Sequence, residues 1–127
     1  MGMATKPIRV LLADDSQAML WGLGKLVEGE APHMALVGRA RHADDALLYA
    51  RLHPDVIVLD LTLGGAGSAE LIPGLRAHSG GRVLIHTGIG DRRLHEDAML
   101  FGAAGVIGAH APAGHVLAAI ECVHAGG

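Results

Sequence analysis

Residues 55–61 read DVIVLDL, an unbroken apolar run of four residues between Asp55 and Asp60. A continuous apolar run of this length is typical of a β-strand that is covered on both faces, as in a parallel sheet. The sequence predicts five such strands: DVIVLDL, together with IRVLLA from Ile8, MALVG from Met34, RVLIHT from Arg82 and GVIGA from Gly105. The second of these along the chain, MALVG, is the least regular, because Gly38 closes it.

Amphipathic segments with helical spacing separate the five apolar runs. Ser16 is placed to cap the first of these helices, Gly102 to end the fourth, and Pro112 to open the fifth. Pro73 lies inside the third segment and has no N–H to donate, so we expect that helix to be short or kinked. The predicted helices follow Ser16, cover residues 42–52, 68–77 and 92–101, and follow Pro112.

Strands that alternate with helices in this way form right-handed βαβ units. The expected fold is therefore α/β, a flavodoxin-like (βα)5 three-layer sandwich with a parallel sheet in the order 2-1-3-4-5. A chain of 127 residues, half of them hydrophobic, suits one domain with a buried core. We expect this domain to cover residues 8–125, after a flexible N-terminus at residues 1–7.

Composition excludes several classes of partner. A net charge of −3 provides no general attraction to nucleic acid or to an anionic membrane. No apolar run approaches the roughly 20 residues that would span a bilayer, and the N-terminus does not read as a secretory signal. Cys122 is the only cysteine, so an internal disulfide is impossible and a reducing cytoplasm is the expected location.

Polar side chains follow the predicted strands at their carboxyl ends. Asp14 and Asp15 end the first strand, Asp60 ends the third, and Thr87 ends the fourth. Function in an open parallel sheet collects at this edge. Any one of these acids alone would be an ordinary turn or cap residue, but three clustered carboxylates repel one another unless a cation joins them. Oxygen ligands of this kind suit Mg²⁺, and one carboxylate would remain free as a nucleophile.

Four motifs in order resemble the receiver domains of two-component response regulators, and the NarL/LuxR-type group most of all. They are LLADDS at 11–16, DVIVLDL at 55–61, VLIHTG at 83–88 and FGAAGVI at 101–107. Each motif alone has little specificity, whereas four at this spacing are specific. The resemblance covers nearly the whole chain, from about residue 8 to residue 125.

The resemblance implies a role for each matching residue. Asp60 matches the phosphoryl acceptor, and Asp15 matches the carboxylate that binds Mg²⁺ directly. Asp14 matches the carboxylate that binds the ion through water, and the backbone carbonyl of Thr62 matches the third protein ligand. Thr87 matches the hydroxyl that moves to hydrogen-bond the phosphoryl group and so reports its arrival.

The resemblance implies a signalling switch and not a metabolic enzyme. Such a switch assists its own phosphorylation and dephosphorylation. A sensor histidine kinase would supply the phosphoryl group. The signal would pass through helix 92–101, strand 105–109 and the last helix to a homodimer partner or an effector. For the NarL/LuxR type, that effector is a helix-turn-helix transcriptional regulator, and DNA would be bound only through such a C-terminal domain beyond residue 127.

Three positions depart from the family pattern. Ala109 stands where the family has a lysine that pairs with the acceptor, a loss that would cost on the order of 10²–10³ in rate if the lysine acts like an oxyanion donor. His110 follows, but its side chain should point to the other side of the strand. Val106 replaces the aromatic residue that couples phosphorylation to the surface. The loop 62–68, TLGGAGS, is rich in glycine and is expected to be mobile.

Two other functions remain open. Ala109 and Val106 favour a pseudo-receiver, a phosphorylation-independent module for protein interaction or dimerisation. A flavodoxin-like domain that binds a small cofactor is disfavoured, because three acids repel a cofactor's phosphate unless a metal is present. The nine histidines show no zinc-ligand spacing, and we interpret His86 as a buried core residue. Trp21, on the first helix, is expected to be partly buried against the sheet.

Overall fold

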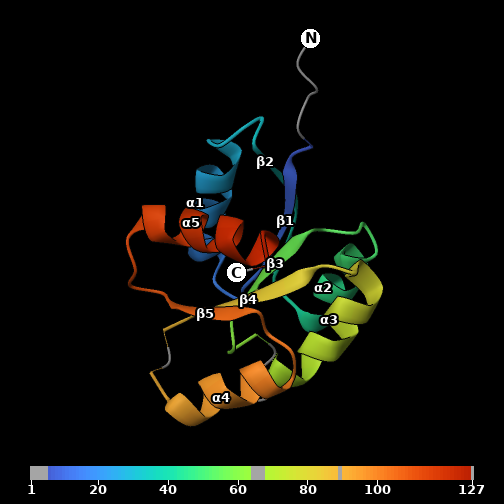
Figure 1. Cartoon of the computed structure of the whole chain (residues 1–127), viewed down its shortest axis with the longest axis vertical. Helices are drawn as coiled ribbons and strands as arrows, with labels where there is room; N and C mark the ends of the chain where they lie inside the picture. Colours follow the sequence, from blue (N-terminus) through green and yellow to red (C-terminus); the bar gives the residue numbers. More distant parts are fainter. Residues whose placement is uncertain (1–5, 64–67, 89, 127) are drawn as a thin grey trace.

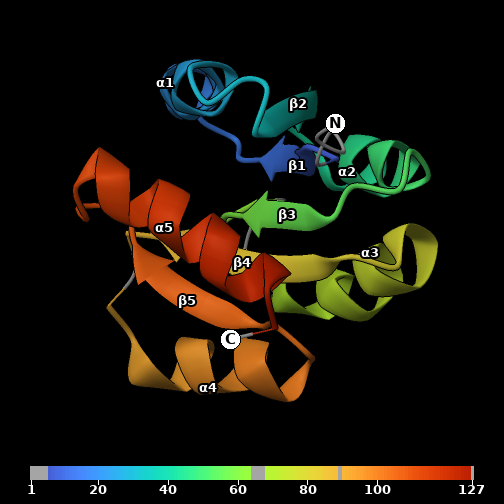
Figure 2. The same ribbon diagram turned by 45° about the horizontal axis from the view of Figure 1, so that its top comes forward.

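The computed structural model describes residues 6–63, 68–88 and 90–126. Its centre is a five-stranded parallel sheet in the order β2-β1-β3-β4-β5, which confirms the predicted topology. Figure 2 shows this order from the top of the molecule to the bottom. The strands are β1 (Ile8–Ala13), β2 (Met34–Ala40), β3 (Val56–Leu59), β4 (Arg82–Thr87) and β5 (Gly105–Gly108).

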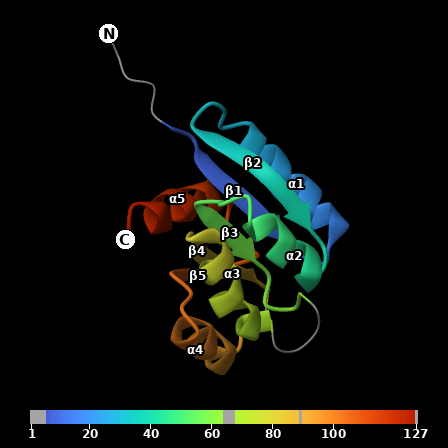
Figure 3. The same ribbon diagram turned by 90° about the vertical axis from the view of Figure 1, so that its right-hand side faces the viewer.

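The helices cover both faces of the sheet and complete a three-layer sandwich. One face carries α1 and α5, which contact each other, and the opposite face carries α2 and α3, which also lie side by side (Figures 1 and 3). The remaining helix, α4, lies beyond β5 at the edge of the sheet (Figure 2). The helices are α1 (Gln17–Glu28), α2 (Ala43–Ala50), α3 (Ile72–Ser79), α4 (Arg92–Leu100) and α5 (Ala113–His124).

Alternate residues of the central strands pack into two separate apolar layers. In β3 and β4, Ile57, Leu59 and Ile85 face α2 and α3, whereas Val58 and Leu84 face α1 and α5. This alternation follows from the twofold side-chain period of a strand. Burial on both faces explains why each central strand reads as a continuous apolar run instead of an alternating one.

Local residue chemistry sets the ends of several helices. The Ser16 hydroxyl accepts a hydrogen bond from the amide of Met19 at 3.2 Å, as expected for the cap of α1. The third helical segment begins as a 3-10 turn over Ser68–Leu71, and α3 itself starts at Ile72 with Pro73 in its first turn. It ends at Gly80, whose φ of 70° lies in the left-handed region. The expected short third helix is confirmed.

Strand β2 continues past Gly38 to Ala40, beyond the predicted end of the second run. The pairing of β1 with β2 shifts by one residue at this point, from Val10 opposite Leu36 to Leu11 opposite Gly38. A side chain at Gly38 would have its Cβ 2.8 Å from the Tyr49 ring, so glycine allows α2 to approach the strand closely. The glycine therefore marks a bulge inside the strand and not its end.

The expectation for Trp21 was wrong, because 64% of its surface is exposed. Leu20, Leu23 and Val27 fill the face of α1 that packs on the sheet, and Trp21 lies outside that stripe. The Lys25 ammonium instead lies over the Trp21 ring, with its nitrogen 5.6 Å from the ring centroid.

Of the helices within the described ranges, none is long and apolar enough to cross a membrane.

Two leucines on helices give a matched test of the core. Leu75 in α3 is fully buried, whereas Leu100 at the end of α4 is 85% exposed. Leu75→Ala should lower the free energy of unfolding by about 2–5 kcal/mol, because it removes buried apolar surface and leaves a cavity. Leu100→Ala should change it by less than about 0.5 kcal/mol. Urea denaturation of both variants measures the difference, and equal losses would contradict the packing described above.

Candidate functional site

The three aspartates predicted to converge do lie together. Asp14 and Asp15 follow β1, Asp60 follows β3, and these two strands are neighbours in the sheet. One carboxylate oxygen from each of the three residues lies within 4.8 Å of the corresponding oxygens of the other two. Asp14 is buried, Asp60 is half-buried and Asp15 is exposed, so the cluster opens to solvent on one side.

Backbone hydrogen bonds fix the two strand ends that carry these acids. The amide of Asp14 donates to the carbonyl of Ala40 at 2.9 Å, and the amide of Asp60 donates to the carbonyl of Ala13, also at 2.9 Å. The sheet ladder therefore extends one residue beyond β1 and β3. The positions of Asp14 and Asp60 are set by the sheet itself and not by a loop.

Neighbouring groups orient the side chains of the cluster. The amide of Ser16 donates to Oδ1 of Asp14 at 2.8 Å. Thr62 contacts Asp60 twice: its amide donates to Oδ1 at 3.2 Å, and its hydroxyl donates to Oδ2 at 2.6 Å. The sequence pointed to Thr62 only through its carbonyl, and the hydroxyl contact was missed. The carbonyl's role as a metal ligand stays a prediction.

The electrostatics of the cluster are those of crowded anions. The pKa of Asp14 is raised from 3.8 to about 6, mainly because burial disfavours the charged carboxylate. The amide of Ser16 opposes this rise, and the charges of Asp60 and Asp15 add to it. A divalent cation with oxygen ligands would neutralise this repulsion, so the donor set fits Mg²⁺.

Thr87 ends β4, the strand next to β3, and only 3% of its surface is exposed. Its carbonyl accepts a hydrogen bond from the amide of Ala109 at 2.8 Å. A Cβ at Gly88 would lie 3.9 Å from the Cβ of Ala109. Position 109 therefore adjoins the end of β4, and in this chain it brings no charged group there.

Comparison with known proteins agrees with this geometry. The response regulator receiver domain family matches residues 10–121. The chain belongs to this family. The receiver is 38% identical, over 107 residues, to protein-glutamate methylesterase/protein-glutamine glutaminase 3 of Myxococcus xanthus, covering 81% of this chain and 30% of that protein. The chain spans less than two thirds of the length of these curated relatives.

Two solved structures show the same fold. The signal receiver domain of the response regulator NarL from Mycobacterium tuberculosis has a TM-score of 0.88 at 23% identity, with 97% of this chain and all of that chain covered. A two-component response regulator of the LuxR family from Aurantimonas has a TM-score of 0.84 at 33% identity, with 94% of this chain and 86% of that chain covered. The predicted receiver fold is confirmed.

Two further residues of the receiver lie at this edge and were not assigned a role by the sequence. The Arg41 guanidinium, just after β2, donates to the backbone carbonyl of Asp15 at 3.5 Å. His86 lies directly before Thr87 in β4 and is 3% exposed, as expected for a core histidine. Burial lowers the pKa of His86, and the charge of Asp60 opposes this effect. The position of Arg41 after a strand was a usable signal for an edge residue.

The departures from the family pattern lie close to the site. Val106 in β5 pairs with Ile85 in β4 and packs, half-buried, against the layer between the sheet and α2 and α3. His110 is exposed. Residues 64–67 of the glycine-rich loop, like residues 1–5 of the N-terminus, lie outside the described residues.

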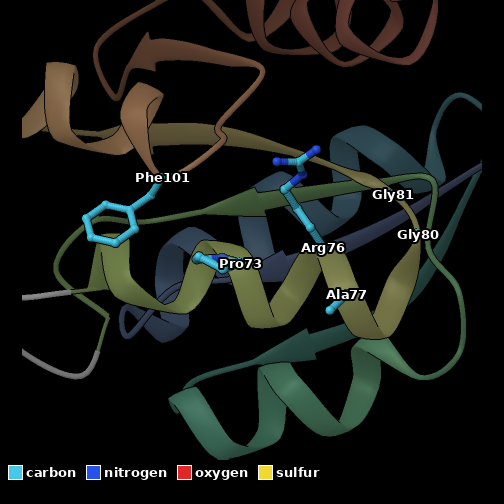
Figure 4. A pocket seen from close by; sticks show the side chains of 6 residues that line it. All are labelled: Pro73, Arg76, Ala77, Gly80, Gly81 and Phe101. Carbon is cyan, nitrogen blue, oxygen red and sulfur yellow. The ribbon is translucent and has the colours of Figure 1, made fainter.

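The hollow in Figure 4 is separate from this site. It has a volume of roughly 440 Å³ and lies between α3 and the turn after α4. Pro73 lies between the Phe101 ring and the Arg76 side chain in this view. None of the clustered aspartates lines it. Arg76 packs over Gly102, whose φ is 110° and whose Cβ would lie 2.2 Å from the guanidinium.

Asp14→Asn should stabilise the metal-free receiver at neutral pH. An acid with a raised folded-state pKa costs stability above that pKa, and the cost is absent below the ordinary value of 3.8. In EDTA at pH 7.5 the gain should be at most about 3 kcal/mol, since each tenfold change in proton affinity is worth about 1.4 kcal/mol. Urea denaturation at pH 7.5 and at pH 3.5 measures the gain, which should vanish at the lower pH.

Glu96→Gln, an exposed change on α4, is the matched control for the loss of one negative charge. It should alter stability by less than about 0.5 kcal/mol at either pH. A stability gain from Asp14→Asn that is equally large at pH 3.5 would contradict the electrostatic explanation.

Proposed function

We propose that this receiver accepts a phosphoryl group on Asp60 from the phosphohistidine of a sensor histidine kinase. The observation that carries the proposal is the grouping of Asp60 with Asp14 and Asp15 within 4.8 Å at the carboxyl edge of the sheet. Asp60 would be the acceptor because it directly follows the central strand β3, is half-buried, and has both carboxylate oxygens oriented by Thr62.

The transfer is a displacement at phosphorus. A carboxylate oxygen of Asp60 forms a new O–P bond while the N–P bond of phosphohistidine breaks, and the histidine nitrogen leaves with the electron pair. Hydrolysis later breaks the O–P bond, releases inorganic phosphate and restores the Asp60 carboxylate. The receiver contributes orientation, charge neutralisation and control of water at the acceptor.

Asp14, Asp15, Asp60 and the carbonyl of Thr62 would hold Mg²⁺. When bound, the ion supplies positive charge that offsets the repulsion between the acceptor and the incoming phosphoryl oxygens. Asp14 contributes charge from a buried position, and its hydrogen bond from Ser16 fixes its orientation. Asp15 is exposed and can adjust to the ion.

The Thr87 hydroxyl would bind a phosphoryl oxygen once Asp60 is modified. Thr87 and Asp60 end adjacent strands, and Thr87 is almost fully buried, so a movement of this side chain must be accommodated by its neighbours. Val106 lies in β5, beside β4, and has no long side chain with which to follow that movement. The change would reach the surface through the backbone of β4, β5 and α4.

The output surface would be formed by α4, β5 and α5. On α4, Leu100 is 85% exposed and Met99 is 47% exposed, which leaves apolar area for a homodimer partner or an effector. A helix-turn-helix transcriptional regulator as effector is supported by the 33% identity to the LuxR-family regulator. DNA would then be bound by that domain and not by the receiver, which would act in the cytoplasm.

One alternative has specific support: a receiver fold that binds its partners without phosphorylation. Ala109 adjoins the end of β4 without a cation, and Val106 stands where the resemblance to the family leads us to expect an aromatic residue. In this alternative the acidic cluster would bind a cation for stability alone. The two functions differ in whether Asp60 ever carries a phosphoryl group.

Incubation with Mg²⁺ and acetyl phosphate should add one phosphoryl group to the receiver, measured by intact mass. Asp60→Asn should abolish this gain, because the amide is not a nucleophile toward phosphorus. Asp44→Asn, at an exposed position in the first turn of α2, is the matched control and should label like the unmodified chain. Labelling that persists in Asp60→Asn, or no labelling of any variant, would contradict the proposed acceptor.

Ala109→Lys should raise the rate of labelling. A pocket of roughly 350 Å³ lies beside Ala109 and provides room for an alkyl chain. A cation at this place would stabilise the negative charge that develops during transfer, an effect worth on the order of 10²-fold for a preorganised group. The time course of intact mass measures the rate, with Ala118→Lys, at an exposed position of α5, as the control for added charge. An unchanged rate would show that the residue at position 109 does not limit transfer.

A further inference from the structure

His86 occupies an unusual place for a polar residue. Strand β4 reads RVLIHT, and His86 is 3% exposed within this apolar strand. Burial of an imidazole removes hydration that a valine or isoleucine would not need, so a histidine is an uncommon choice at this position. Hydrophobic packing alone would be served better by valine or isoleucine.

The register of the sheet sets His86 beside the phosphoacceptor. Leu59 of β3 pairs with Ile85 of β4, so the next residues along the two parallel strands are Asp60 and His86. The Asp60 amide still continues the ladder to Ala13, which keeps Asp60 in the plane of the sheet. Neighbouring strands lie about 4.8 Å apart, so the two residues are adjacent.

The two side chains also belong to the same face. Val58 and Leu84, each two residues earlier, pack on the α1 and α5 side. His86 itself lines a pocket of roughly 350 Å³ together with Met19 and Leu23 of α1 and Val116 of α5. The charge of Asp60 acts on the pKa of His86, which is consistent with their proximity.

The same pocket contains Ala109. His86 pairs with Ile107 of β5, so Ala109 lies two residues further along β5, beside Gly88 and beyond the level of Asp60 and His86. The short side chain of Ala109 leaves space unfilled beside His86, since both residues line this pocket. An imidazole carries at least one ring N–H whether it is neutral or protonated, so His86 has a hydrogen to donate.

We propose that His86 is a phosphoryl-binding residue of this receiver, whose imidazole N–H donates a hydrogen bond to a phosphoryl oxygen on Asp60 in the space that Ala109 leaves unfilled. The proposal rests on Asp60 being the phosphoacceptor. It requires no change in the charge of the ring. It assigns a function to a buried polar residue of an otherwise largely apolar strand.

The first test compares labelling rates with acetyl phosphate and Mg²⁺. His86→Leu should slow labelling of Asp60 by about 10²-fold, the usual loss when one preorganised donor to a developing oxyanion is removed. His86→Gln keeps an N–H donor of similar reach and should stay within about tenfold of the unmodified rate. His110→Leu, an exposed change next to Ala109, is the matched control and should have no effect.

A double-mutant cycle separates binding of the phosphoryl group from packing. If His86 fills the place of a cation at position 109, Ala109→Lys should raise labelling more in the His86→Leu background than in the unmodified chain. Equal gains in the two backgrounds would overturn the proposal. The urea midpoint of each variant shows that the proteins compared are folded.

Nitrogen NMR of the histidine rings tests the contact without a substitution. Addition of Mg²⁺ and beryllofluoride, a noncovalent phosphoryl mimic, should shift the ring signals of His86 and leave those of His110 unchanged. An unshifted His86 ring, or labelling of His86→Leu at the unmodified rate while Asp60→Asn does not label, would overturn the role of His86 and leave the acceptor intact. Absence of any labelling of the unmodified chain would refute both.

Discussion

Repulsion among three carboxylates is the constraint around which this receiver is built. Asp14, Asp15 and Asp60 are drawn within 4.8 Å of one another, and burial raises the pKa of Asp14 to about 6. Such a cluster persists only because the surrounding structure determines it: the amides of Asp14 and Asp60 are part of the sheet ladder, and that ladder is fixed by strands buried on both faces. The stability of the core therefore supplies the free energy that holds unfavourable charges in place.

The same constraint explains how the cluster can respond to a signal. Groups that repel one another in the absence of a cation gain most from a ligand that brings positive charge, so the cluster is arranged to favour a divalent cation before one arrives. Thr62 and Ser16 orient two of the carboxylates through short local hydrogen bonds. Under the proposed function, Asp60 would therefore need little rearrangement when phosphoryl transfer begins.

Much of this fold followed from the sequence because burial on both faces leaves a strong signal. All five strands, their order and the convergence of Asp14, Asp15 and Asp60 were predicted from apolar runs and from the residues that follow them. The burial of Trp21 was predicted wrongly because Trp21 lies one position away from the buried face of α1, where even an aromatic ring is exposed. The extension of β2 past Gly38 depends on the approach of Tyr49, a contact between segments that periodicity does not report.

The relation between His86 and Asp60 was likewise hidden, since it depends on the pairing of β3 with β4 and not on either strand alone. Once the register is known, positions 86 and 109 can be compared as two places from which a donor could reach Asp60. A receiver can meet the need for a donor from β5, across β4, or from β4 directly. The second route would use a shorter side chain, held by a buried strand. It would also separate recognition of the phosphoryl group from β5, where the side chain of Val106 is too small to transmit a large movement.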